Sequence, residues 1–217
     1  MQINWYGEGC FKLVENGTTI TVDPVESFTG LTAPRFKTDV VIKTLMTPIS
    51  PEDEKPIAGN DEDANMGGSD AVVIAGPGEY EVKGIQITGW PLVKSSTADV
   101  LRSIFKIKTD DISVGLLGHL SAFNDPEILE ELGDVDILII PGGGEPYIKQ
   151  SDAAKLIRQI EPRMVIPSFF KVPGLKRKSE DASEFLKELG MKAEPVDKIS
   201  IKHKELGEKL QVVLLTL

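Results

Sequence analysis

The chain has 217 residues, 41% of them hydrophobic and 27% charged, which is typical of a globular protein with a substantial core. Its formal charge of -10 argues against nucleic acid or an anionic membrane surface as a partner, because both are polyanions. Cys10 is the only cysteine, so no intrachain disulfide and no cysteine-rich metal site can form. The chain shows no signal-like start and no apolar run near the roughly 20 residues that span a bilayer, so we expect a cytoplasmic protein.

The first half of the chain predicts short strands separated by turns. Asn16-Gly17 lies between two alternating runs, which is a strong hairpin signal, and it predicts strands over Cys10–Val14 and Thr18–Asp23. Alternation and turn residues predict further strands over Ala71–Ala75, Tyr80–Lys83, Ile85–Gly89, Arg102–Thr109 and Ile112–Leu117.

The second half alternates strands with helices. A proline in the first turn fits a helix over Asp125–Leu132, and apolar residues at helical spacing predict another over Ser151–Glu161. A third helix is predicted over Asp181–Leu189, with a capping box formed by Asp181 and Glu184. Strands are predicted over Asp136–Ile140, Met164–Ile166, Lys198–Lys202 and Leu210–Leu217.

This order of elements fits an α/β protein. A strand-rich half followed by strand–helix alternation suits a four-layer αββα sandwich, although periodicity alone equally allows another α/β arrangement. We take residues 1–217 as a single domain with one unusual segment, at about 51–70. That segment combines many acids with glycines and few apolar residues, so we expect a solvated, mobile loop.

The acidic segment also contains an incomplete calcium-loop pattern. Asp61-x-Asp63-x-Asn65 has the spacing that opens an EF-hand, but Met66 replaces the required glycine and Val72 the closing glutamate. A solvated charged loop is therefore predicted, with weak binding of a divalent cation as the alternative.

Several segments resemble, in their order along the chain, the metallo-β-lactamase-fold superfamily. These segments are Asn4–Phe11, Thr21–Pro24, Asp39–Ile42, Gly76–Gly84, Val135–Pro141 and Ile160–Pro167. The chain is most similar to the branch of Zn-dependent hydrolases that includes ascorbate-6-phosphate lactonase-like proteins. The resemblance implies an αββα sandwich and a metal loop, His-x-His-x-Asp-His, after the strand that ends near Lys43.

The positions that match the family's metal ligands carry other residues. The metal loop corresponds to Leu45–Ser50, which has no imidazole or carboxylate. Later family histidines fall near Lys94 and Phe169, and His119 matches the metal-bridging aspartate. Catalytic zinc needs at least three protein ligands, so we predict a degenerate member without catalytic or metal-binding residues. The residues expected around the former cleft are Glu8, Asp23, Leu45, Thr47, Ser50, Lys94, His119 and Phe169.

Two functions follow from this pattern. The first is a catalytically inactive, metal-free protein with a binding or assembly role, whose partner is a protein, a small molecule or a second copy of the chain. The alternative is a hydrolase of phosphodiester, lactone or other ester bonds with a relocated or single zinc, manganese or iron ion. Its contributors would be Glu8, Asp23, His119, Glu52 and Asp53.

The remaining chemistry-bearing residues have ordinary interpretations. His119 is read as a loop histidine with local hydrogen bonds, or else as a surviving ligand. His203 is expected at the end of the terminal strand, and Cys10 is expected to be a small core residue. Gly142–Gly144 predicts a tight turn, with anion binding as the alternative. A solvated loop, or a patch for an acidic partner, is predicted for the basic cluster Lys171, Lys176, Arg177 and Lys178.

Overall fold

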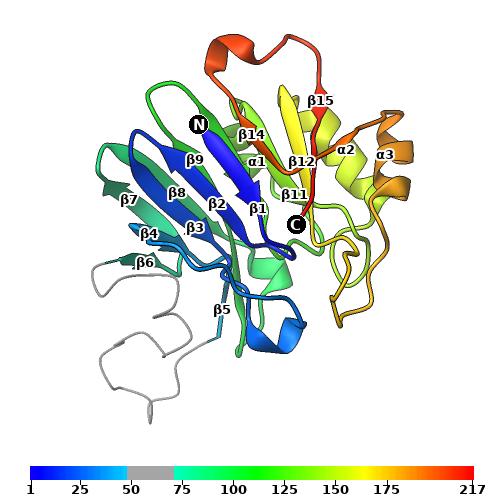
Figure 1. Cartoon of the computed structure of the whole chain (residues 1–217), viewed down its shortest axis with the longest axis horizontal. Helices are drawn as coiled ribbons and strands as arrows, with labels where there is room; N and C mark the ends of the chain where they lie inside the picture. Colours follow the sequence, from blue (N-terminus) through cyan, green and yellow to red (C-terminus); the bar gives the residue numbers. More distant parts are fainter. Residues whose placement is uncertain (48–70) are drawn as a thin grey trace.

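The computed structural model describes residues 1–47 and 71–217. In this part of the chain two β-sheets pack face to face, and α-helices cover the outer side of one of them (Figure 1). The predicted loop at 51–70 and its calcium-like pattern lie outside the described residues, as do Ser50, Glu52 and Asp53.

The first sheet is built around the N-terminal hairpin. Asn16 and Gly17 have φ angles of 49° and 78°, the conformation that a two-residue hairpin turn requires. The side chains of Ile3, Phe11 and Leu13 alternate into the space between the sheets. Within the described residues the strand order of this sheet is β14 (Lys198–Ser200), β1 (Gln2–Trp5), β2 (Phe11–Glu15), β3 (Thr18–Val22), β4 (Val40–Ile42) and β6 (Val72–Ile74).

The second sheet contains the most deeply buried strands. Its described strand order is β15 (Gln211–Val212), β12 (Met164–Ser168), β11 (Ile137–Pro141), β10 (Ser113–Leu116), β9 (Leu101–Lys108), β8 (Ile85–Pro91) and β7 (Gly78–Val82). Every residue of β11 and β12 is buried. The first sheet covers one face of these parallel strands and helices cover the other, which explains their continuous apolar runs. The short strand β5 (Leu45–Met46) pairs with β9.

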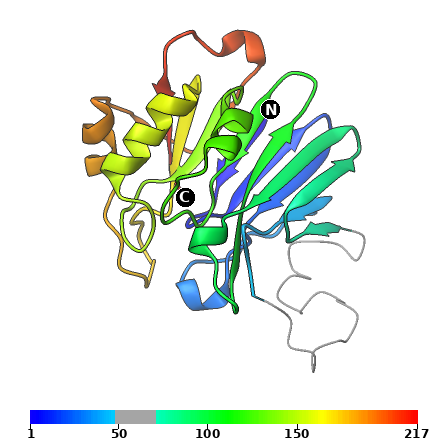
Figure 2. The same ribbon diagram turned by 180° about the vertical axis from the view of Figure 1, so that it is seen from behind.

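Helices α1 (Pro126–Leu132), α2 (Gln150–Ile160) and α3 (Ser183–Leu189) pack on the second sheet, as Figure 2 shows from behind. Asp125 caps α1 by accepting a hydrogen bond from the Ile128 amide, which confirms the predicted start. Short 3-10 helices are formed by η1 (Ser27–Thr29), η4 (Val93–Ser95) and η5 (His203–Glu205). Among the described residues no helix has the length and apolar character needed to cross a bilayer.

Two local predictions differ from the structure. The capping box at the third helix is wrong, because α3 starts at Ser183 and Glu184 pairs with Lys187 instead. Asp181 accepts a hydrogen bond from the Ser183 amide at 2.8 Å. The predicted strand Leu210–Leu217 is divided, because β15 pairs with β12 whereas β16 (Leu214–Leu215) pairs with β13 (Pro195–Val196).

The α/β sandwich itself was predictable, and its core has two parts. One lies between the sheets, where Trp5 and Phe170 stack with ring centroids 4.5 Å apart. The other lies between the second sheet and the helices. Among the described residues no α-helix covers the outer face of the first sheet, where Gln2 and Asn4 stay partly exposed (Figure 1).

Candidate functional site

A group of polar and aromatic residues gathers where the parallel strands end. Asp23 directly follows β3, and Thr44 follows β4 after a single residue. His119 lies in the turn after β10, and Phe169 directly follows β12. In α/β folds the carboxyl ends of strands are the usual place for ligands.

Thr44 joins Asp23 to His119. Its backbone amide donates to Asp23 Oδ1 at 2.7 Å, and its hydroxyl donates to Asp23 Oδ2 at 2.6 Å. The same hydroxyl oxygen lies 2.8 Å from His119 Nδ1. Thr44 is fully buried, whereas the side chain of His119 is 19% exposed. We call these three residues the relay.

Gly118 makes this close approach possible. It has a φ angle of 44°, in the left-handed region that favours glycine. A Cβ atom at this position would overlap the side chain of Thr44. The residue before His119 must therefore be a glycine for the turn to reach Thr44.

Burial dominates the electrostatics of Asp23. It raises the pKa of the Asp23 carboxyl above its ordinary value, while His119 and the two hydrogen bonds from Thr44 oppose the rise. Asp23 also has a φ angle of 39°, which is uncommon for a residue other than glycine. Such local strain is often found at functional sites.

Two aromatic rings form a wall against His119. The Phe169 ring lies 4.8 Å from the imidazole and the Tyr147 ring 5.8 Å from it, both in edge-to-face geometry. Phe169 adopts a φ angle of 55°, a strained value for an aromatic residue. Burial raises the pKa of Tyr147 to about 12, so its hydroxyl remains protonated at neutral pH.

Glu8 pairs with Arg177. The Arg177 Nε donates to Glu8 Oε2 at 3.2 Å, and Nη2 donates to the carbonyl oxygen of Phe169 at 2.8 Å. The guanidinium also lies over the Tyr147 ring at 5.0 Å. Arg177 thus neutralises Glu8 and holds the strained Phe169 backbone in place.

The other residues expected around the cleft are placed differently. Leu45 begins β5 and pairs with Arg102 on β9. Thr47 is exposed, and Lys94 is exposed in η4. The structure therefore brings together Asp23, His119 and Phe169, keeps Glu8 beside Phe169, and leaves Thr47 and Lys94 on the surface.

Sequence reasoning missed three residues of the site. Thr44 directly precedes Leu45, the first position that matches the family loop, and it has no ligand-type side chain of its own. Tyr147 had no motif of its own. Arg177 belongs to the basic cluster that was read as a solvated loop, but its side chain is only 24% exposed because it faces Glu8.

The glycine turn after β11 has a packing role. A Cβ atom on Gly143 would overlap the backbone carbonyl of Phe169, so this turn must pass close to the segment after β12. This close packing explains why the turn contains glycine, as the prediction of a simple turn requires.

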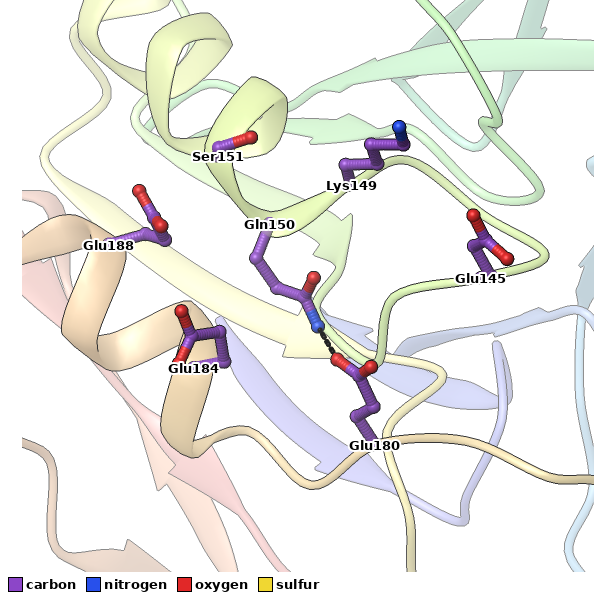
Figure 3. Close-up of a pocket in the computed structure, with 7 residues that line it drawn as sticks. All are labelled: Glu145, Lys149, Gln150, Ser151, Glu180, Glu184 and Glu188. Atoms are coloured by element: carbon purple, nitrogen blue, oxygen red, sulfur yellow. Dashed lines mark hydrogen bonds between the residues drawn. The ribbon is translucent and has the colours of Figure 1, made fainter.

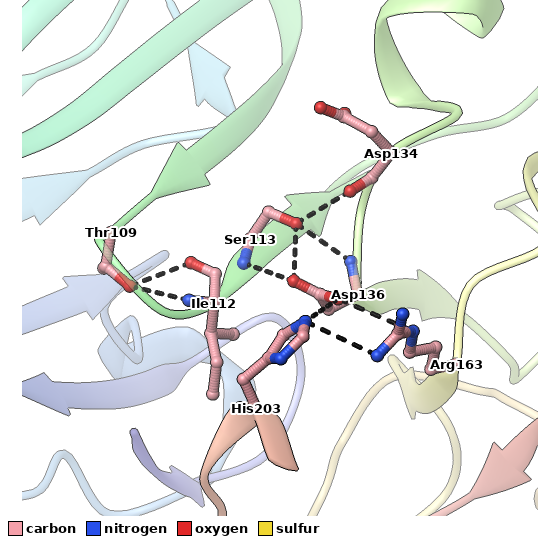
Figure 4. Close-up of polar contacts among 7 residues, drawn as sticks. All are labelled: Thr109, Ile112, Ser113, Asp134, Asp136, Arg163 and His203. Carbon is pink, nitrogen blue, oxygen red and sulfur yellow. Dashed lines mark hydrogen bonds and ion pairs between the residues drawn. The ribbon is translucent and has the colours of Figure 1, made fainter. Parts of the chain in front are cut away.

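His203 belongs to a separate polar network at the opposite ends of the strands (Figure 4). It lies in η5 and does not continue a strand as expected. Its Nε2 is 3.6 Å from Asp136 Oδ1 and 3.4 Å from the Arg163 guanidinium. Asp136 also accepts hydrogen bonds from the amide and hydroxyl of Ser113, both at 2.9 Å. This network ties η5 to the amino ends of β10, β11 and β12.

An acidic cavity of about 340 Å³ lies between α2 and α3 (Figure 3). Gln150 at the start of α2 donates a hydrogen bond to Glu180 at 2.7 Å across it. The residues that line the cavity are Glu145, Lys149, Gln150, Ser151, Glu180, Glu184 and Glu188. None of the residues expected around the cleft belongs to this lining.

The described residues do not form a metal site on their own. Within 1–47 and 71–217 no three His, Cys, Asp or Glu side chains lie close enough together to hold a metal ion. Asp23 and His119 are two such side chains, and both oxygens of Asp23 already accept hydrogen bonds from Thr44. Catalytic zinc takes three protein ligands, so this part of the chain does not by itself fit a zinc centre.

Known proteins are similar to this chain over different lengths. A UPF0173 metal-dependent hydrolase of Thermococcus onnurineus is 32% identical over 56% of this chain and 54% of that relative. The chain thus spans about half the length of the first curated relatives it matches. A UPF0173 protein of Pyrococcus furiosus is 25% identical over 87% of this chain and 90% of that protein.

A solved structure is similar over the whole chain. It is that of a candidate Zn-dependent hydrolase of the metallo-beta-lactamase superfamily from Thermotoga maritima. It has a TM-score of 0.77 and 26% identity, and the match covers 99% of each chain. This likeness confirms the predicted metallo-β-lactamase-like α/β sandwich.

The names of these relatives overturn the prediction of an inactive, metal-free protein. These relatives are described as metal-dependent hydrolases, and the Thermotoga maritima protein as a candidate Zn-dependent hydrolase. The prediction rested on the residues at Leu45–Ser50, Lys94 and Phe169 alone, and those positions do not by themselves decide whether a chain of this family binds a metal.

Most of the chain matches a single known protein family. Residues 2–168 match the family described as the beta-lactamase superfamily domain. This span runs from β1 to the end of β12 and includes all three relay residues. The chain therefore belongs to the beta-lactamase superfamily.

Proposed function

We propose that this protein is a metal-dependent hydrolase of ester-type bonds, in phosphodiesters, lactones or other esters. Support comes from the relatives named metal-dependent hydrolases and from the whole-length likeness to the candidate Zn-dependent hydrolase of Thermotoga maritima.

The observation on this chain that carries the proposal is the relay. A hydrogen-bonded acid, hydroxyl and imidazole lie at the carboxyl ends of the strands, and the imidazole is the most exposed of the three, at 19% against 9% for the Asp23 side chain. Such a group can orient a histidine for proton transfer. No reaction step is assigned to a metal, because the described residues do not form its site.

The aromatic wall and the Arg177–Glu8 pair complete the surroundings. Phe169 and Tyr147 place apolar surface beside the imidazole. Water cannot reach the part of the ring that these two side chains cover. Arg177 is held by Glu8 and by the carbonyl oxygen of Phe169. We expect this pair to preserve the shape of the site and not to take part in proton transfer.

The test combines metal content with hydrolysis of defined esters. The full chain is purified without chelator, analysed for zinc, manganese and iron, and assayed with bis(p-nitrophenyl) phosphate, p-nitrophenyl butyrate and dihydrocoumarin. We expect near-stoichiometric metal and hydrolysis of at least one probe, lost on chelation and restored by the same metal. Protein that hydrolyses none of the three probes, with each metal supplied in turn, contradicts the proposal whether or not it holds metal.

A further inference from the structure

We infer that His119 is the proton acceptor of the hydrolytic reaction and that Thr44 positions its ring, with Nδ1 protonated and Nε2 unprotonated. This inference rests on the proposed function, because it assigns roles in that reaction. It starts from the hydrogen bonds of one buried hydroxyl group.

The Thr44 hydroxyl has a single proton and two close partners. An ionised carboxylate only accepts hydrogen bonds, so the proton of Thr44 Oγ1 goes to Asp23 Oδ2 at 2.6 Å. The remaining contact, at 2.8 Å, then requires His119 Nδ1 to donate to Thr44 Oγ1. A neutral imidazole has one N–H, so Nε2 of His119 carries a lone pair.

The Nε2 atom is the ring nitrogen that Thr44 does not hold. Within the part of the chain that the structure describes, no residue hydrogen-bonds to it, and the His119 side chain is 19% exposed. Tyr147 and Phe169 pack against the ring and Thr44 holds Nδ1, so the imidazole cannot rotate freely. A water molecule beside Nε2 would meet a fixed proton acceptor.

The arrangement supports the attack of water on the ester, with His119 as the proton acceptor. His119 Nε2 accepts a proton from water while the water oxygen forms a bond to the acyl carbon or phosphorus of the ester. The proton then passes to the leaving oxygen as its bond to that carbon or phosphorus breaks. The products are an acid and an alcohol, and no group is oxidised or reduced.

The protonation state of His119 is measured directly by long-range ¹H–¹⁵N NMR on the full chain with ¹⁵N-labelled histidine. The chain has two histidines, and H203Q assigns the second without touching the relay. We expect the Nδ1–H tautomer at neutral pH in the wild type. A wild-type spectrum with Nε2–H overturns the inference, and this reading needs no variant of the relay to fold.

Substitutions of Thr44 test its positioning role. T44V removes the hydroxyl at nearly constant volume, and T44S keeps it. We expect T44V to lose the Nδ1–H tautomer and to lower kcat at least about tenfold, within the roughly 10⁴-fold that a wrong histidine tautomer costs. KM changes little, because Thr44 is fully buried. T44S should keep the Nδ1–H tautomer and most of kcat, because it keeps the hydroxyl. H203Q should have the same kcat and the same His119 tautomer as the wild type.

The outcomes separate the inference from the proposed function. If the wild type hydrolyses an ester and T44V keeps its tautomer and kcat, the relay has no positioning role and the proposed function stands. If the wild type hydrolyses none of the three esters, the proposed function fails. The proton-acceptor role of His119 is then also wrong. The NMR measurement of the His119 tautomer in the wild type and in T44V still decides whether Thr44 orients the ring.

Discussion

Single residues determine the candidate site through the space they leave and the hydrogen bonds they make. Gly118 lacks a Cβ and lets the turn after β10 reach Thr44, and Thr44 then joins Asp23 to His119. Phe169 lies directly after β12, and its ring packs against His119 with centroids 4.8 Å apart. The imidazole is thus held by a hydrogen-bonding contact with Thr44 and by aromatic packing against Phe169.

Cys10 gives a prediction at this scale. Burial raises the pKa of the Cys10 thiol to about 12, and the nearby Asp23 carboxylate adds to the rise. The neutral thiol therefore predominates below that pH, and the reactive thiolate is scarce at pH 8. We expect no reaction of native protein with Ellman's reagent at pH 8, and full reaction in guanidinium chloride. Since Cys10 is the only cysteine, rapid labelling of the native chain would contradict its buried placement.

Individual elements followed their local sequence signals closely. The Asn16-Gly17 hairpin and the start of α1 match their predictions, because turns and caps depend on neighbouring residues. Helix α2 matches its predicted range to within one residue, since its apolar face has helical spacing. The predicted capping box of α3 does not form, because Asp181 accepts a hydrogen bond from the Ser183 amide and not from the amide of Glu184.

The buried face of α2 gives a prediction at the scale of an element. Leu156 is 4% exposed and packs between α2 and the second sheet. We expect L156A to lower the free energy of unfolding by about 2–5 kcal/mol, because it leaves a cavity. Q159A on the exposed face of the same helix should change it by less than about 0.5 kcal/mol. Urea denaturation measures both, and equal effects would show that α2 does not pack as described.

At the scale of the whole molecule, the side chains packed between the two sheets stabilise the fold and fix the position of the site. Trp5 on β1 stacks on Phe170, which lies just after β12, so this pair connects the two sheets. Phe170 also follows Phe169 directly, which links the packing of the core to the wall beside His119. The fold class could be predicted because the order of strands and helices already limits the layers.

The Trp5–Phe170 pair gives a prediction at this scale. F170A should lower the free energy of unfolding by about 3–5 kcal/mol, because a large buried ring is removed. In a W90F background Trp5 is the remaining tryptophan, and its fluorescence should shift to longer wavelength as water reaches it. F28A, at a side chain that is 70% exposed, provides the matched control. An unchanged Trp5 spectrum in F170A would argue against the stacked pair.

The sequence by itself determined the α/β class, the hairpin, the helices and the buried parallel strands, because these depend on local propensity and on apolar spacing. That some family positions lack their usual ligands stays a prediction from the resemblance. Only the tertiary structure decided that Thr44 lies between Asp23 and His119, which are 21 and 75 positions away from it in the chain. Contacts of this kind depend on strand register and on the packing of two sheets, and no local pattern in the sequence specifies them.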